Sequence, residues 1–156
     1  MNVNNIPIVG QKRGYFISFE GADGSGKGTQ VDLLKQALEK TGFVVRVVRA
    51  PGGCELGEQV RKLTKNPKIK MAFETELLLM CAATGQSARE LIKPALDRGE
   101  IVIADRYYHS TIVYQGFGRQ LDQTFVKAAI QFSLGDVMQD VTFCRSEEHT
   151  SELQSH

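Results

Sequence analysis

Short apolar runs alternate along this chain with stretches in which apolar residues recur every three or four positions. The runs predict strands over 15–20, 43–49, 101–105 and, at its start only, 141–144. The run at 43–49 is rich in valine, so we expect that strand to be buried. Helical spacing predicts a helix over 27–40 that is closed by Gly42. Two strands joined by a helix of this length form a βαβ unit with parallel strands.

Helical spacing continues through the rest of the chain. It predicts helices over 56–64, 73–83, 86–98 and 122–134, with a further helix start at 107–115. The last of these helices is expected to face inward with Phe125, Ala128, Ala129 and Phe132. Strands that alternate with helices in this way predict an α/β fold in three layers, a parallel sheet with helices on both faces.

Three local features modify this pattern. Gly85 is expected to interrupt the helical stretch around it. Pro94 lies inside the next stretch and predicts a kink or a later helix start. Residues 116–119 are expected to form a flexible basic loop.

Composition places the chain among ordinary globular proteins. Its 156 residues suit one domain, and 42% are apolar and 24% charged. No apolar run approaches the roughly 18 residues of a membrane span, and the net charge of +1 argues against a dedicated nucleic-acid binder. Cys54, Cys81 and Cys144 lack metal-type spacing, so we expect reduced thiols and a cytoplasmic location.

Both ends of the chain are set apart from this domain. Residues 1–13 are polar and are expected to be a disordered lead-in. Residues 145–156 interrupt the last strand abruptly and look like a translated sequencing adapter, so we expect an artefactual tail; a genuine polar tail is the alternative. The domain is then 14–144, and it is expected to be incomplete at its C-terminus, with the last strand and a lid missing.

A glycine-rich turn joins the first strand to the first helix: Gly21, Ala22, Asp23, Gly24, Ser25, Gly26, Lys27, Gly28 and Thr29. Its glycines let several backbone N–H groups point at one anion, and the helix start adds about half a positive charge. Lys27 supplies a full charge, so the turn is predicted to bind phosphates; a tight turn with a chance lysine is the alternative. Gly28 stands where a hydroxyl usually holds Mg²⁺, a loop that resembles those of nucleoside-monophosphate kinases.

The ends of two other strands carry further candidates. Ligands of open parallel sheets bind beyond the carboxyl ends of the strands, where Arg49 and the turn Pro51–Gly53 lie, although that turn could be purely structural. Asp105 ends an apolar strand and is a candidate for organising Mg²⁺, and Arg106 beside it suits phosphate oxygens; a surface salt bridge is the alternative. Phosphoryl transfer needs such positioned charges and little covalent help.

Four motifs together resemble the thymidylate kinase family: Gly21-x-Asp-Gly-x-Gly-Lys27, Arg49-x-Pro-Gly-Gly53, Glu76-Leu-Leu-Leu79 with Lys93-Pro-Ala-Leu96, and Asp105-Arg-Tyr107 with Ser110-Thr111 and Tyr114-Gln-Gly-Phe-Gly-Arg119. The resemblance implies a P-loop nucleoside-monophosphate kinase fold. It also implies transfer of the ATP γ-phosphate to dTMP, giving dTDP and ADP, with Mg²⁺ and as a homodimer.

The resemblance also implies roles for individual residues. ATP phosphates would bind at Gly21–Thr29, catalysis would involve Lys27, Asp23, Arg106 and Asp105, and Mg²⁺ would be held by Asp105 and Asp23, in part through water. The implied dTMP-binding residues are Arg49, Pro51, Gly52, Met80, Gln86, Arg106, Ser110, Thr111, Tyr114 and Gln115.

Three positions depart from the family pattern. Ala50 stands in place of Glu, Met80 in place of a Phe that stacks on thymine, and Thr84 in place of an Arg that reaches the base. A kinase for another pyrimidine deoxynucleoside monophosphate therefore stays open, as does a non-catalytic nucleotide-binding fragment. Members with a glycine at the position of Gly24 take a catalytic arginine from the lid, so we expect the chain as written to be nearly inactive.

Overall fold

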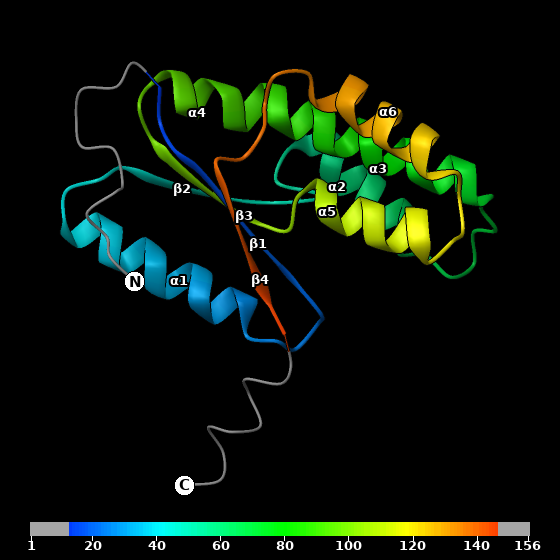
Figure 1. The fold of residues 1–156 in the computed structure, drawn as a ribbon, viewed down its shortest axis with the longest axis horizontal. Coiled ribbons are helices and arrows are strands. Elements are labelled where there is room, and N and C mark those ends of the chain that lie inside the picture. The colour runs from blue at the N-terminus through cyan, green and yellow to red at the C-terminus, as the bar shows by residue number, and fades with distance from the viewer. Residues whose placement is uncertain (1–12, 147–156) are drawn as a thin grey trace, which may run out of the picture.

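Four parallel strands form the centre of the structure, a computed structural model that describes residues 13–146 (Figure 1). They are β1 (Phe16–Gly21), β2 (Val45–Arg49), β3 (Ile101–Asp105) and β4 (Val141–Arg145). The order across the sheet is β2-β3-β1-β4, with β1 and β3 paired from Phe16 opposite Val102 to Phe19 opposite Asp105. The loops after β1 and β3 therefore leave the same edge of the sheet side by side.

Helices cover both faces of the sheet, as predicted. On one side lies α1 (Lys27–Lys40), whose bounds match the prediction (Figure 1). Near the other face lie α2 (Glu55–Thr64), α3 (Phe73–Ser87), α4 (Lys93–Asp97), α5 (Tyr108–Thr111) and α6 (Gln123–Leu134), with π-helical turns η2 (Ala88–Ile92) and η3 (Ile112–Phe117). No helix within residues 13–146 is long and apolar enough to cross a membrane.

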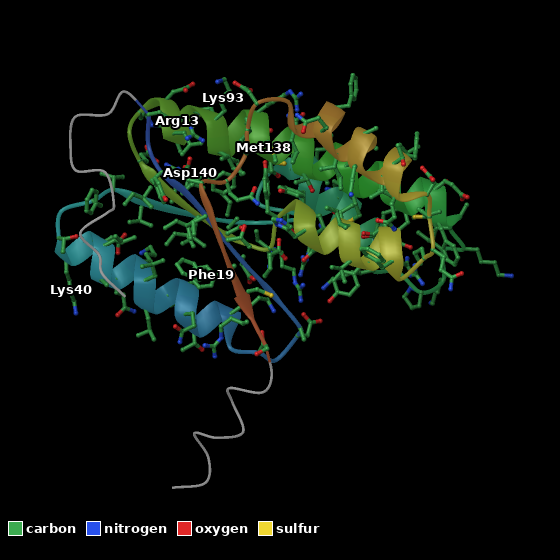
Figure 2. All side chains as sticks on the ribbon, in the orientation of Figure 1. Arg13, Phe19, Lys40, Lys93, Met138 and Asp140 are labelled. Atoms are coloured by element: carbon green, nitrogen blue, oxygen red, sulfur yellow. The ribbon has the colours of Figure 1, made fainter. Side chains whose placement is uncertain are left out.

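Side chains that alternate along β1 feed two separate cores. Ile17 and Phe19 pack with Val31 and Leu38 of α1, and Figure 2 shows Phe19 between the sheet and that helix. Phe16 points the other way, into the core beneath α3 and α6. Strand residues buried on both faces produce an apolar run with no polar alternation, which is what the sequence shows at β1 and β3.

The strand over 43–49 was predicted to be buried, but the structure places it at the edge of the sheet. Val45–Arg49 forms the edge of the sheet, and Val47 is 41% exposed while Val48 alone in this strand is buried. A β-branched run fits any pleated surface, so composition does not separate an edge strand from a central one.

The predicted interruption at Gly85 is wrong. Helical structure runs from Phe73 to Asp97 as α3, η2 and α4, and a Cβ added at Gly85 would lie 2.6 Å from the backbone oxygen of Ser133 on α6. The glycine is therefore needed where two helices approach closely. The wider turn of η2 directly precedes Pro94, which has no N–H to donate to the helix.

Helix α6 begins one residue later than predicted, ends at the predicted residue, and faces the core with other residues. Val126, Ile130 and Leu134 are buried, whereas Phe125 is 53% and Phe132 88% exposed. The helix is apolar on two sides, so periodicity could not identify the side that packs on the domain.

The remaining corrections concern connections and ends. Gly116 and Phe117 belong to η3 and not to a basic loop. Strand β4 begins at Val141 and continues one residue past the predicted segment 141–144, to Arg145. Arg13 forms an ion pair with Asp140 at 2.9 Å, just before β4 (Figure 2). Most of the predicted lead-in (1–12) and of the predicted tail (147–156) lies outside the described residues.

Candidate active site

The phosphate loop curls tightly between β1 and α1. Gly24 and Gly26 have positive φ angles of 82° and 76°, which glycine adopts without strain. Inside the curl, the Ser25 hydroxyl and the Lys27 ammonium donate to the carbonyl oxygen of Ala22 at 2.9 Å and 2.5 Å. Helix α1 has no acidic residue in its first turn, and Gly26 brings no capping side chain. Its first N–H groups and Lys27 can therefore be offered to an anion.

Arg106 lies at the centre of a charged network directly beside this loop. Its Nη2 donates to Asp23 Oδ1 at 2.6 Å, and its Nη1 donates to Ser110 Oγ at 3.0 Å. The Ser110 hydroxyl donates in turn to Glu20, a buried carboxylate at the end of β1. The hydrogen bond from Arg106 holds the pKa of Asp23 below its ordinary value. Glu20 was not predicted, since it occupies an ordinary strand-end position in the sequence.

A cavity of about 420 Å³ opens beside Arg106 and Asp23. Seven of the predicted acceptor residues line it: Pro51, Met80, Arg106, Ser110, Thr111, Tyr114 and Gln115. They come from the loop after β2, from α3, and from the segment that follows β3. Residues from three separate parts of the chain thus converge at the carboxyl edge of the sheet, as expected for an open parallel sheet.

Three predicted acceptor residues are not brought to this cavity. Gln86 donates to Glu90 and lines a different cavity, because six helical positions after Met80 it lies about 120° around the helix axis from that residue. Arg49 donates to Glu58 at 2.8 Å, and the Gly52 carbonyl accepts from Ser87 at 2.8 Å. Arg49 and Gly52 thus help to brace the turn that borders the cavity.

The polar wall of this cavity contains the predicted Gln115 and also Glu76, which was not predicted as a site residue. Glu76 of α3 accepts from Gln115 Nε2 at 2.7 Å and pairs with Arg119 at 3.3 Å. The Thr84 hydroxyl donates to the backbone oxygen of Met80 at 2.8 Å, so it is already used within the helix. Met80 and Thr84 therefore make a wall of the cavity without a charged donor.

The residues present fit a single carboxylate contact to Mg²⁺. Asp105 Oδ1 is buried without a hydrogen-bond partner, and the residue lines a cavity of about 390 Å³ that also contains Gly28. An orphaned carboxylate oxygen suits a hard cation. Asp23 lines the other cavity and is paired with Arg106, so the two acids are not brought together. Within residues 13–146, no three His, Cys, Asp or Glu side chains are grouped closely enough to hold a metal alone. Mg²⁺ usually takes its remaining ligands from water and phosphate.

Known proteins match both the sequence and the fold. The profile of the thymidylate kinase family matches residues 19–154. Thymidylate kinase of Halothermothrix orenii is 45% identical over 131 residues, which cover 84% of this chain and 63% of that protein. That of Kosmotoga olearia is 44% identical over 127 residues, covering 81% and 61%. The crystal structure of thymidylate kinase from Ehrlichia chaffeensis has a TM-score of 0.79 at 38% identity, covering 85% of this chain and 75% of that one. The chain thus spans a little under two thirds of these two curated relatives.

Proposed function

Because the chain belongs to the thymidylate kinase family, we propose that it transfers the γ-phosphate of ATP to dTMP, giving dTDP and ADP. One observation carries the proposal: the phosphate loop after β1 and Arg106 after β3 lie side by side and are joined by the pair of Asp23 and Arg106. A donor phosphate and an acceptor phosphate would meet at this point.

The proposed reaction requires charge and alignment more than covalent chemistry. An oxygen of the acceptor phosphate forms a bond to the γ-phosphorus, while the bond from that phosphorus to the β–γ bridging oxygen breaks. Lys27 and the first N–H groups of α1 would stabilise charge on the donor phosphates. Arg106 would neutralise the acceptor phosphate, which otherwise repels the donor. Mg²⁺, when bound near Asp105, would supply further positive charge to the phosphate oxygens.

The cavity beside Arg106 is the proposed acceptor site. The guanidinium carbon of Arg106 lies 5.5 Å from the ring centroid of Tyr114, so the phosphate-binding group and this ring face one space. We infer that Tyr114 packs against the deoxyribose and disfavours a 2′-hydroxyl. Gln115, held by Glu76, would border the nucleotide.

The wall formed by Met80 and Thr84 supports a second candidate, a kinase with broader acceptance of pyrimidine deoxynucleoside monophosphates. A charged donor in this wall would favour a base that presents an oxygen over one that presents an amino group. Because the Thr84 hydroxyl donates its only proton to Met80 O, it cannot donate to a base oxygen, so this hydroxyl does not favour thymine over cytosine. dTMP, dUMP and dCMP would then differ less in their use as acceptors.

An assay of ADP release with dTMP, dUMP, dCMP and dGMP as acceptors tests both candidates. We expect dTMP to be used best and the purine dGMP least. A Lys27→Ala variant should lower turnover a hundredfold or more, about the effect of removing one preorganised charge contact. Such a loss would also show that the activity does not come from a contaminating kinase. Preference for dGMP would contradict the proposal, and binding of ATP and dTMP without ADP release would support the non-catalytic alternative.

We further propose that the protein forms a homodimer, in which a second copy of this chain docks on the face formed by α3 and α6. Leu78, Phe125 and Phe132 are 52%, 53% and 88% exposed there, around a cavity of about 750 Å³. Within residues 13–146, Arg89 is the one charged residue lining that cavity, and it donates to Gly85 O at 3.0 Å. A surface this apolar and this poor in charge is typical of homodimer interfaces. The cytoplasmic location stays a prediction.

A further inference from the structure

Glu20 is a buried acid whose two oxygens are both bound by the segment after β3. The residue is 5% exposed. Its Oε1 accepts the backbone N–H of Tyr107 at 2.8 Å, and its Oε2 accepts the hydroxyl of Ser110 at 2.6 Å. Burying a carboxylate is costly unless hydrogen bonds and an opposite charge compensate it. The nearby cation is Arg106, which donates to the same Ser110 oxygen at 3.0 Å.

The backbone of Arg106 is held in a conformation that an arginine rarely adopts. Its φ angle is +69°, in the left-handed region, which costs a non-glycine residue about 1 kcal/mol or more. Two hydrogen bonds hold the backbone at Arg106 and Tyr107 against two consecutive residues of β1, Phe19 and Glu20. The Arg106 N–H donates to Phe19 O at 2.9 Å, and the Tyr107 N–H donates to Glu20. Glu20 thus contributes to both the backbone and the side-chain placement of Arg106.

The two edges of the guanidinium have different partners. Nη1 is hydrogen-bonded to Ser110, which is hydrogen-bonded to Glu20. Because Glu20 is buried, a ligand does not replace it in this arrangement. Nη2 is paired with Asp23, whose side chain is 95% exposed. Because the Asp23 carboxylate is already open to water, it loses little solvation when it leaves Arg106, so an incoming anion can replace it at low cost.

We propose that Glu20 is the positioning residue for the acceptor phosphate. Through Ser110 and the Tyr107 N–H it fixes the Nη1 edge of Arg106, while the Nη2 edge exchanges Asp23 for the phosphate of the acceptor. This inference rests on the proposed function, since it assumes that Arg106 binds the acceptor. It also gives Ser110 a role besides the dTMP contact that the family resemblance implies, as the bridge between Arg106 and Glu20.

Glu20→Gln tests the inference, because the amide keeps the shape and can still accept the Tyr107 N–H. It removes the charge, and its NH₂ group cannot accept the Ser110 hydroxyl. We expect the Kd for dTMP, measured by isothermal titration calorimetry, to rise at least tenfold while the Kd for ATP changes less than twofold. Ser110→Ala should weaken dTMP binding several-fold, and Ser110→Thr, which keeps the hydroxyl, should restore it to within twofold.

Ser18→Ala is the matched control for a purely structural effect. It lies on the same strand and removes a buried hydrogen bond to Thr142 of 2.9 Å, without touching Glu20 or Arg106. It should lower the melting temperature and leave the Kd for dTMP unchanged. In an Arg106→Ala background, Glu20→Gln should have no further effect on dTMP binding, because its effect passes through that arginine.

If Glu20→Gln leaves the Kd for dTMP unchanged, the inference is overturned. It is also overturned if Glu20→Gln weakens dTMP binding by the same factor in the Arg106→Ala background as in the parent. The proposed function fails differently. If the parent binds inorganic phosphate but not dTMP, the proposed acceptor is wrong, and the same variants titrated with phosphate still decide the role of Glu20. A parent in which Arg106→Ala changes the binding of neither probe would overturn both.

Discussion

At the scale of single residues, the cysteines show how burial changes the chemistry of one side-chain type. Cys81 on α3 is 5% exposed, and burial raises the pKa of its thiol to about 11, with a hydrogen bond to Ser133 opposing the shift. Cys144 on β4 is exposed. The same residue type therefore has two different environments within one domain, which composition could not distinguish.

The thiol of Cys81 should be unreactive in the folded protein. With a pKa of about 11, roughly one thiol in a thousand is ionised at pH 8, and the thiolate is the reactive form. Iodoacetamide at pH 8 should therefore label Cys144 and spare Cys81, as peptide mass spectrometry can show. Addition of denaturant should make the two cysteines react alike; equal labelling without denaturant would contradict the prediction.

The same shift sets the sign of a pH effect on stability. The thiol pKa is higher in the folded state than its ordinary 9.0, so the unfolded chain loses this proton first as pH rises. Cys81 therefore lowers the free energy of unfolding between about pH 9 and pH 11 and has no such effect below pH 9. The stability advantage of the parent over Cys81→Ala should shrink in that range, measured by urea unfolding at each pH. A constant difference would contradict the raised pKa.

At the scale of elements, packing between helices decides what a glycine does. In an isolated helix, glycine is unfavourable by about 1 kcal/mol relative to alanine. At Gly85, however, a Cβ would lie 2.6 Å from Ser133 O and 3.2 Å from Ser133 Cβ, against the partner helix α6. Local propensity predicted a helix break here, and tertiary packing overrides it.

Gly85→Ala should therefore destabilise the protein although propensity alone predicts stabilisation. Overpacking of this kind costs about 1–3 kcal/mol. Ala37→Gly, at an exposed position of α1 away from this contact, is the control and should cost about 1 kcal/mol. Urea unfolding of both variants checks the signs, and a stabilised Gly85→Ala would show that the two helices do not approach as closely as described.

Sequence patterns predicted where helices and strands lie along the chain better than they predicted what packs against each one. The bounds of α1 followed from glycines and helical spacing, which act locally. The edge position of β2 and the buried side of α6 depend on neighbours far along the chain, so local patterns could not fix them. In the site, Lys27 and Arg106 were recognisable because motifs with an implied role carry them. Glu76 lies in a motif without such a role, and its contribution, like that of Glu20, depends on hydrogen bonds to residues far along the chain.

At the scale of the whole molecule, the exposed apolar face on α3 and α6 sets the expected assembly. Phe132→Glu should convert a dimer into a monomer, because a charge at the centre of an apolar interface cannot be desolvated cheaply. Val44→Glu is the control, since Val44 is 65% exposed and precedes the edge strand β2. Sedimentation velocity measures both variants; a parent that is monomeric at micromolar concentration would contradict the dimer.

The pair of Asp23 and Arg106 makes the two binding loops thermodynamically dependent on each other. Asp23 belongs to the loop after β1 and Arg106 to the segment after β3, and they meet at 2.6 Å. An anion that takes the place of Asp23 on Arg106 leaves an unpaired carboxylate within the phosphate loop. The affinity of that loop for its own ligand must then change, and linkage requires the reverse influence to be equal in size. Through this one ion pair, each of two ligands would thus change the affinity of the chain for the other by the same factor.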